Sequence, residues 1–243
     1  MIIKIFHWLA SILCTLAFAL VMNFSHLILF FVLFFGDRPR KIWGDWVNFL
    51  IIQSLRISGA QFTISNSQNY PLNRPLLIIS NHQSMFDIPL IGWALRKHNP
   101  KFVAKKELAK HVPFVSMNLR NGAGILIDRS NPSQSIRAIE EYGKVIAKNN
   151  YAIALFPEGT RARDGVIKNF KTSGFKTLIK SMPNCLIVPL AIINSWELVK
   201  HKMFPVPFGI KVSLKFLPAQ EPSDDLVTQL KDIQTQIVAE MKG

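Results

Sequence analysis

The sequence contains little cysteine, and its two cysteines suggest no structural framework. Cys14 lies inside a long apolar run, and Cys185 lies far from it along the chain. Neither has another Cys or a His two to four positions away, which is the usual spacing of structural zinc ligands. These absences exclude a disulfide-stapled domain and a zinc module, and they favour a reducing compartment.

Acidic residues are also scarce, since 15 Asp and Glu stand against 29 Lys and Arg, a formal net charge of +14. This excess favours anionic partners such as phosphates, nucleic acid, acidic proteins or a membrane surface, without choosing between them. Hydrophobic residues make up 49% of the 243 residues and charged residues only 18%, which excludes intrinsic disorder. The length allows one large domain, with or without an appendage.

No Asp, Glu, Lys or Arg occurs between Ile5 and Gly36. About 20 apolar residues suffice for a helix that crosses a bilayer, whereas a cleavable signal peptide has an apolar core of only about 7 to 15. The segment therefore predicts a membrane anchor. The polar stretch 23–26 interrupts it near its middle, so it forms either one tilted span or, as we favour from sequence, two short helices that dip into one leaflet.

The residues after the apolar segment predict its orientation. Three basic residues within 38–41 follow it, against the single Lys4 before it. The positive-inside tendency therefore predicts that the rest of the chain faces the cytoplasm. Trp43 and Trp46 then stand one helical turn apart among aliphatic residues, which fits either an interfacial helix or an ordinary core helix.

After residue 58, short β-rich apolar runs alternate with helical periodicity, a pattern typical of α/β domains. The predicted strands cover residues 61–65, 76–80, 101–104, 124–127, 151–156, 185–192 and 210–216. The predicted helices cover residues 88–96, 107–119, 133–148, 172–181 and 223–242. We therefore expect residues 1–58 to form membrane-anchoring helices and residues 59–243 to form one catalytic-sized domain.

A His and an Asp follow the predicted strand 76–80. His82 stands where open α/β sheets place their ligand sites, just beyond the end of a strand. Asp87 would lie on a different face of any continuous helix, so the two side chains must meet across a turn. The Ile-Pro after Asp87 predicts that it caps the next helix. An Asp that orients one imidazole nitrogen makes the other a better base; the alternative is that the two residues have separate structural roles.

Two further strand ends carry residues suited to phosphate. The motif Phe-Pro-Glu-Gly-Thr-Arg at 156–161 places a carboxylate, a glycine and an arginine after an apolar run. Gly159 permits a close approach of backbone to ligand, and the planar fork of Arg161 suits bidentate phosphate binding. The predicted strand 124–127 is followed by Asp-Arg, which ends at Arg129. Because connected strands tend to align their ends, a shared site is more probable than three coincidences.

These blocks resemble those of the glycerolipid acyltransferase family, in particular its bacterial type of 1-acylglycerol-3-phosphate acyltransferase. The resemblance runs from about residue 75 to residue 192, and four blocks in the right order make it highly specific. The blocks are Asn-His-x4-Asp at 81–87, Lys-Glu-Leu at 106–108 leading to Asp-Arg at 128–129, Phe-Pro-Glu-Gly-Thr-Arg at 156–161, and Val-Pro-x-x-Ile at 188–192.

The chain departs from the family pattern at two places. Ser116 stands where these proteins often carry Gly, three residues after the proline of the second block. Residues 170–173 read Phe-Lys-Thr-Ser, where Phe-Lys-x-Gly is frequent. Neither position belongs to the proposed base, so the departures concern the fit of the acceptor or of the acyl chain.

The resemblance implies an α/β fold in which a mixed central sheet is flanked by helices, with an N-terminal apolar helical membrane anchor. It also implies an acyl transfer. His82, held by Asp87, would take the proton from the free hydroxyl of a lysophosphatidic acid, whose oxygen would attack the thioester of acyl-CoA or acyl carrier protein. The product would be phosphatidic acid for phospholipid synthesis. No cofactor, metal or covalent enzyme intermediate would be required beyond the acyl thioester co-substrate.

The resemblance further implies where the substrates bind and where the protein lies. Glu158 and Gly159 would contact the acceptor glycerol or shape its turn. The phosphate would be held by Arg161 together with Lys105 or Lys106 and Arg129. The expected partners are membrane lipids, lysophosphatidic acid, and acyl carrier protein or acyl-CoA, with no nucleic acid. The expected location is the bacterial inner membrane or another cytoplasmic membrane, with the catalytic domain facing the cytoplasm.

Three alternatives remain open at this point. An acyltransferase for another acceptor, such as a lysophospholipid or a lyso-aminolipid, is the most serious. A hydrolase with Ser84 as nucleophile is disfavoured because the sequence contains no Gly-x-Ser-x-Gly elbow. A basic scaffold that binds nucleic acid or anionic lipid would explain the charge, but it leaves Asp87 and Glu158 without a purpose.

Overall fold

The computed structural model describes residues 2–65, 69–110, 112–128 and 130–242, without the side chains of residues 2 and 3. The strands are β1 (Gln61–Ser65), β2 (Leu76–Ser80), β3 (Lys101–Lys105), β4 (Gly124–Ile127), β5 (Ala152–Leu155), β6 (Leu186–Ile193) and β7 (Lys211–Phe216). The α-helices are α1 (Ile2–Val32), α2 (Asp37–Arg56), α3 (Asp87–Ala94), α4 (Val115–Asn118), α5 (Pro132–Asn149), α6 (Thr172–Ser181) and α7 (Leu226–Lys242). Short 3-10 or π segments cover Leu33–Phe35, Arg96–His98, Lys106–Ala109, Leu119–Ala123 and Ser195–Val199.

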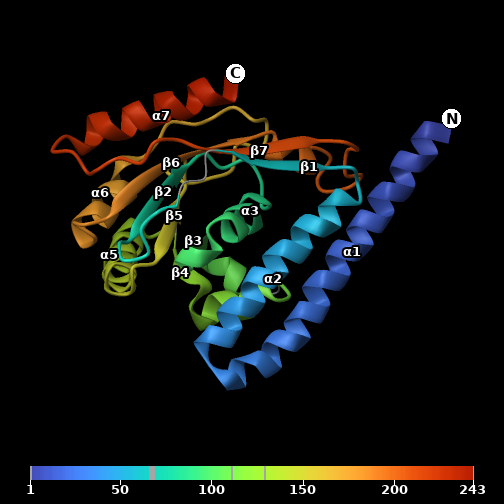
Figure 1. The fold of residues 1–243 in the computed structure, drawn as a ribbon, viewed down its shortest axis with the longest axis horizontal. Coiled ribbons are helices and arrows are strands. Elements are labelled where there is room, and N and C mark those ends of the chain that lie inside the picture. The colour runs from blue at the N-terminus through green and yellow to red at the C-terminus, as the bar shows by residue number, and fades with distance from the viewer. Residues whose placement is uncertain (1, 66–68, 111, 129, 243) are drawn as a thin grey trace.

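The strands form one sheet in the order β1-β7-β6-β2-β5-β3-β4. β6 and β7 pair antiparallel, and the other neighbouring strands of the sheet pair parallel. Figure 1 shows α7 and α6 on one side of the sheet, and α3 and α2 on the other. The predicted α/β fold with a mixed central sheet is confirmed. The parallel strands β2 and β5 end at the same edge, and the loops after them carry the candidate site.

The central strand β2 shows why both faces of the sheet need helices. All five of its residues are buried, as expected for a strand covered on both sides. Because side chains alternate along a strand, Leu76 and Ile78 join the core beneath α2 and α3. Leu77 and Ile79 join the core beneath α5, α6 and α7. Burial on both faces fixes the register of β2 and hence the position of the loop that follows it.

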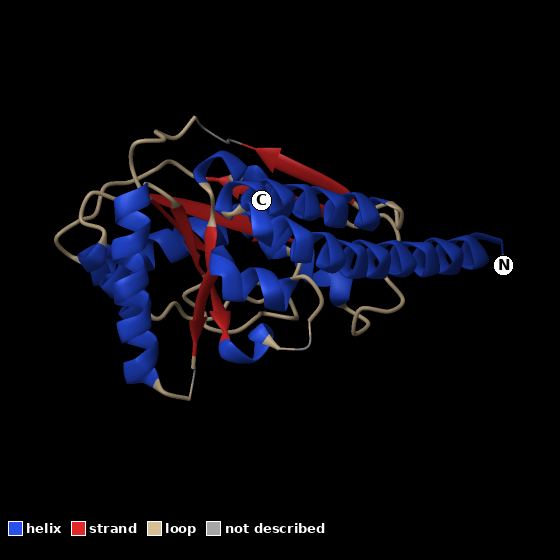
Figure 2. Cartoon of the chain, turned by 90° about the horizontal axis from the view of Figure 1, so that it is seen from below, coloured by secondary structure: helices blue, strands red, loops and turns tan. Residues whose placement is uncertain are grey.

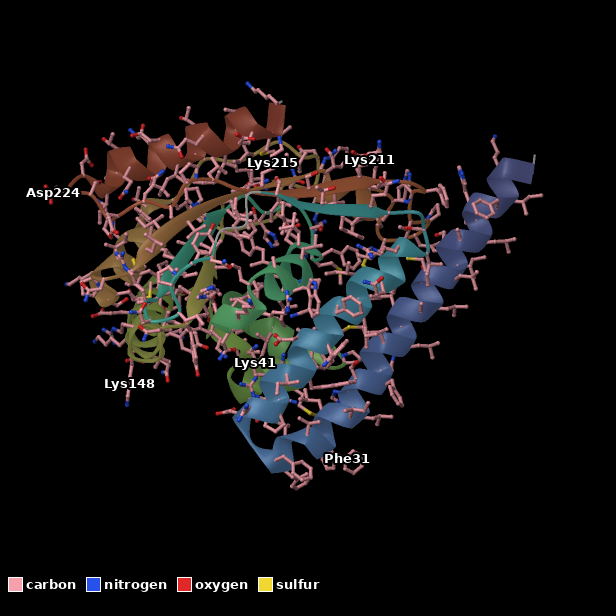
Figure 3. All side chains as sticks on the ribbon, in the orientation of Figure 1. Phe31, Lys41, Lys148, Lys211, Lys215 and Asp224 are labelled. Carbon is pink, nitrogen blue, oxygen red and sulfur yellow. The ribbon has the colours of Figure 1, made fainter. Side chains whose placement is uncertain are left out.

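The apolar N-terminal segment forms one uninterrupted helix, α1, so the predicted break at 23–26 is wrong. The Asn23 side chain donates to the carbonyl four residues earlier at 2.8 Å, and the Ser25 carbonyl accepts from Trp43 Nε1 of α2 at 3.3 Å. The first bond engages the Asn23 amide within the helix and the second joins α1 to α2, whereas the buried Ser25 hydroxyl has no hydrogen-bond partner among the described residues; the helix nevertheless continues through 23–26. Figures 1 and 2 show that the N-terminal end of α1 extends beyond the rest of the molecule, and Figure 3 places Phe31 near the turn into α2.

Helix α2 is a core helix with one exposed tryptophan. Val47 and Leu55 are buried between α1 and the sheet domain, whereas Trp46 is 51% exposed. Arg40, used above to predict orientation, is itself buried and donates to the Asn118 side chain at 3.1 Å. Lys41 ion-pairs within α2 and points toward the domain. Arg40 and Lys41, two of the three basic residues after α1, therefore form contacts within the protein. The positive charge available to set the orientation of α1 in a membrane is smaller than the sequence suggested.

The predicted helix over residues 107–119 is also wrong. A 3-10 turn ends at Ala109, and α4 begins only at Val115. Pro113 cannot donate a backbone hydrogen bond and disfavours helical conformation in the residue before it. Phe114 then adopts a φ of 60°, and its backbone N–H donates to His26 Nδ1 of α1 at 3.0 Å. The segment is a connection that docks on α1.

Candidate functional site

The structure brings His82 and Asp87 together. His82 lies in the loop after β2, and Asp87 is the first residue of α3. The loop turns so that His82 Nδ1 lies 2.8 Å from Asp87 Oδ2. The His82 side chain is 15% exposed and stacks on the Phe156 ring with centroids 4.1 Å apart, whereas Asp87 is fully buried. With Nδ1 engaged, Nε2 is the nitrogen that can receive a proton from a substrate.

Asp87 does not cap α3, contrary to the sequence prediction. Its carboxylate points back into the preceding loop, where Oδ2 accepts the backbone N–H groups of Gln83 at 2.7 Å and Ser84 at 3.0 Å. Its other oxygen, Oδ1, accepts the Ser84 hydroxyl at 3.3 Å. The turn is therefore built by the same carboxylate that orients His82.

Ser195 completes this arrangement and is a residue that the sequence did not reveal. It is fully buried at the start of the 3-10 turn after β6, and its hydroxyl donates to Asp87 Oδ1. Its backbone N–H donates to Gln83 Oε1 at 3.0 Å. Ser195 stands far from Asp87 along the chain and carries no motif, so only the pairing of β2 with β6 brings the two together.

Glu158 joins the two loops of the site. Its Oε1 accepts the backbone N–H of His82 at 2.7 Å, and its Oε2 accepts the backbone N–H of Lys168 at 2.9 Å. Burial raises the pKa of Glu158, while these two N–H bonds oppose the shift. Gly159 follows with a φ of +71° in a turn closed by its own N–H to the Phe156 carbonyl. Of the two predicted roles, shaping the turn fits these contacts better than binding glycerol.

A basic cavity of about 800 Å³ lies beside this loop. It is lined by four cations and one carboxylate together with a threonine: Lys105, Arg161, Arg163, Lys168, Asp164 and Thr160. The Ala162 N–H donates to the His82 carbonyl at 2.7 Å, so the backbone that carries Arg161 and Arg163 is joined directly to the loop of His82. The cavity can therefore hold an anionic group on a loop that is hydrogen-bonded to the loop of His82.

The sequence predicted only part of this cavity. Lys105 and Arg161 line it as expected, whereas Arg163 and Lys168 were missed. Both could have been predicted from the sequence, because they lie with Arg161 in the basic, glycine-containing loop that follows β5. Lys168 Nζ donates to the Thr160 hydroxyl at 3.0 Å and to the Arg161 carbonyl at 3.1 Å, and so braces the loop from within.

Lys106 is not among the residues that line the cavity. Lys106 forms an ion pair with Asp128, and this hydrogen bond lowers the pKa of Asp128 to about 2. Lys106 is therefore directed at a carboxylate of its own chain and away from the phosphate predicted for it. Arg129 lies outside the described residues.

Comparison with known proteins shows what the chain is similar to. The chain is 30% identical over 198 residues to a 1-acyl-sn-glycerol-3-phosphate acyltransferase of Limnanthes douglasii, covering 80% of this chain and 66% of that protein. It is 29% identical over 143 residues to the enzyme of the same name from Pseudomonas aeruginosa, covering 59% and 54%. The chain spans 54 to 66% of the length of the first plant relatives.

A solved structure shares the fold. The crystal structure of the 1-acyl-sn-glycerophosphate acyltransferase from Thermotoga maritima aligns with a TM-score of 0.76 at 24% identity, covering 98% of this chain and 96% of that one. Residues 61–193 match the model of the Acyltransferase family, and that range holds His82, Asp87, the Glu158 loop and the basic cavity. The chain belongs to the acyltransferase family.

Proposed function

We propose that this protein transfers a fatty acyl group from an acyl thioester, acyl carrier protein or acyl-CoA, to the free hydroxyl of 1-acyl-glycerol-3-phosphate and so makes phosphatidic acid. The observation that carries the proposal is the His82–Asp87 pair, with Nδ1 2.8 Å from Oδ2, in a loop that is hydrogen-bonded to the loop lining a cavity with four cations. A base alone would serve many acceptors. A base next to a cationic cavity favours an acceptor that carries both a hydroxyl and a phosphate.

The reaction follows from the orientation of the imidazole. His82 Nε2 takes the proton of the acceptor hydroxyl while Asp87 stabilises the imidazolium that forms. The acceptor oxygen bonds to the thioester carbonyl carbon, the carbon–sulfur bond breaks, and the thiolate leaves and recovers the proton from His82. Ser84 bonds to Asp87 and to the backbone of its own loop, which supports a structural role for it over that of a nucleophile.

A panel of acceptors tests the proposed function. Purified protein in detergent is supplied with acyl-CoA or acyl carrier protein and with lysophosphatidic acid, a lysophospholipid or a lyso-aminolipid, and the products are resolved by lipid chromatography. We expect phosphatidic acid to be the main product. Preferred acylation of an acceptor without a terminal phosphate would contradict the assignment of the basic cavity and would favour the second candidate, an acyltransferase for another lysolipid.

The Arg161→Lys variant tests the phosphate contact. An ammonium group keeps the charge but cannot make the planar, two-pronged contact of a guanidinium. We expect the KM for lysophosphatidic acid to rise roughly 10-fold, with a smaller change in kcat. Arg137→Lys, at an exposed position on α5, is the matched control. If only the KM for the acyl donor changes, Arg161 binds the phosphates of the donor and the assignment is wrong.

The Ser195→Ala variant tests the positioning of Asp87. Removing the hydroxyl leaves Oδ1 with the longer 3.3 Å bond from Ser84 Oγ. Because hydrogen bonds to charged groups are strong, we expect kcat to fall roughly 10-fold with little change in either KM. Ser195→Thr should recover part of the loss. The control is Ser54→Ala, which removes a buried hydroxyl that donates to the Ile51 carbonyl within α2. An equal kcat loss there would indicate a general packing effect.

We also propose that α1 lies in the plane of the membrane. The segment Lys4–Phe35 is long and apolar enough to cross a bilayer. However, α1 touches the sheet domain along its length: Ser11 Oγ accepts the Val206 N–H at 2.8 Å, the Phe18 ring meets Phe86, and His26 accepts from Phe114. A helix docked in this way lies beside the domain, and its exposed apolar face supports insertion into one leaflet.

A further inference from the structure

The loop between the 3-10 turn Ser195–Val199 and β7 exposes an unusual combination of side chains. Residues 200–204 read Lys-His-Lys-Met-Phe and are all exposed. Met203 is 39% exposed and Phe204 is 44% exposed. Lys202 and Met203 have φ values of 55° and 79°, a conformation that residues other than glycine adopt only at a cost. The basic Lys202 and the apolar Met203 are thus both exposed at the tip of a strained turn.

Aromatic side chains of this loop, including Phe204 of the tip, pack against α1. The Phe208 ring stacks on His7, with centroids 4.6 Å apart, and meets the edge of Phe6 at 5.3 Å. Phe204 meets Trp8 at 5.6 Å. Loop 200–208 therefore extends the exposed apolar face of α1 sideways.

One of the three basic side chains at the tip contacts an aromatic ring, since Lys200 Nζ lies 5.4 Å from the centroid of the Trp196 ring. Among the described residues, none of Lys200, His201 and Lys202 forms an ion pair. Basic side chains beside aromatic and aliphatic ones are typical of segments that bind anionic membranes, because the cations meet lipid phosphates while the apolar groups enter the interface. An acidic protein would match the lysines but would not explain the outward Met203 and Phe204.

We propose that loop 200–208 is a second membrane contact, which binds anionic headgroups of the bilayer through Lys200 and Lys202 while Met203 and Phe204 enter the interface. Together with α1 it fixes the rotation of the domain about the helix axis, which one helix alone would leave free. The proposal rests on the membrane association of α1 given under the proposed function.

Site-specific fluorescence distinguishes the two contacts. In the full-length protein, a cysteine is placed at Met203 in the loop, at Leu20 on the exposed face of α1, or at Lys148 on α5, and labelled with an environment-sensitive dye. The native Cys14 and Cys185 are both buried. Figure 3 shows Lys148 on α5, away from α1. The probes are then exposed to vesicles of phosphatidylcholine with or without phosphatidylglycerol.

We expect a blue shift at positions 203 and 20 and none at 148, with the shift at 203 larger on the vesicles that contain phosphatidylglycerol. A shift at 20 without one at 203 would overturn the loop contact while leaving the membrane association of α1 intact. No shift at either position would overturn that association itself. Equal shifts at 203 on neutral and anionic vesicles would overturn the role of the lysines.

A charge variant provides an independent test without a dye. Lys200→Gln combined with Lys202→Gln should lower the partition of the protein onto phosphatidylglycerol-containing vesicles roughly 5- to 30-fold, and high salt should erase the difference. The matched control, Lys148→Gln combined with Lys180→Gln, removes two exposed lysines from α5 and α6. If the control weakens partition as much as the loop variant, net charge rather than the loop attracts the protein, and the proposal is wrong.

Discussion

The His82→Ala variant is expected to lower the rate of acyl transfer by roughly 100-fold or more, because a positioned general base contributes about that much. His82 Nδ1 is held by Asp87 at 2.8 Å, so the ring has one orientation and its Nε2 has one direction of approach. The initial rate of phosphatidic acid formation at saturating substrates measures the loss. The KM for lysophosphatidic acid should change little, since Arg161, which we propose binds the phosphate, lies on the neighbouring loop.

Two controls separate lost chemistry from lost structure. The His82 ring stacks on Phe156, so its removal also leaves a gap, and thermal melting must show that the variant folds. Imidazole added to the solution should restore part of the activity by entering that gap. Turnover close to that of the wild type in a folded sample would show that His82 is not the base.

The Asp87→Asn variant is expected to lower kcat by roughly 100- to 1,000-fold through loss of charge. Two backbone N–H groups, from Gln83 and Ser84, require an acceptor, so the amide oxygen should take the place of Oδ2 and still accept from His82 Nδ1. The amide nitrogen would then face the Ser195 hydroxyl, which can rotate to accept. The tautomer of His82 is preserved, but the imidazolium formed during proton transfer loses its counter-charge.

Asp224→Asn is the matched control for this variant. It removes one carboxylate at an exposed position, labelled in Figure 3, and should leave kcat unchanged. Melting curves of both variants are needed because Asp87 also builds the turn before α3. A kcat for Asp87→Asn within about threefold of the wild type would indicate that Asp87 serves the fold and not the base.

Much of the fold could be predicted from local patterns. Strands β1, β2 and β4 occupy the predicted residues, and α6 does so as well, because period-two and helical apolar patterns are strong there. The break predicted at 23–26 and the helix predicted at 107–119 were wrong for the same reason: contacts between segments far apart in the sequence determine the backbone conformation there. Trp43 stabilises the α1 helix where Asn23 and Ser25 suggested a break, and Phe114 docks on His26 where periodicity suggested a helix.

Site residues could be predicted where a sequence motif directly follows the end of a predicted strand. His82, Asp87 and Arg161 follow directly from that rule. Ser195 could not be found, because it approaches Asp87 only through the pairing of β2 with β6. For Glu158 the sequence left two roles open, since a carboxylate that accepts two backbone N–H groups looks the same in sequence as one that faces a substrate.

The most direct test of the account measures two products in one reaction. Purified protein in detergent is incubated with acyl-CoA, with and without lysophosphatidic acid, and the released thiol and the phosphatidic acid are quantified together. Direct transfer through a general base predicts that thiol appears in a one-to-one ratio with phosphatidic acid and depends on the acceptor. Thiol release without acceptor at the full rate, or an acyl group bound covalently to the protein, would contradict it.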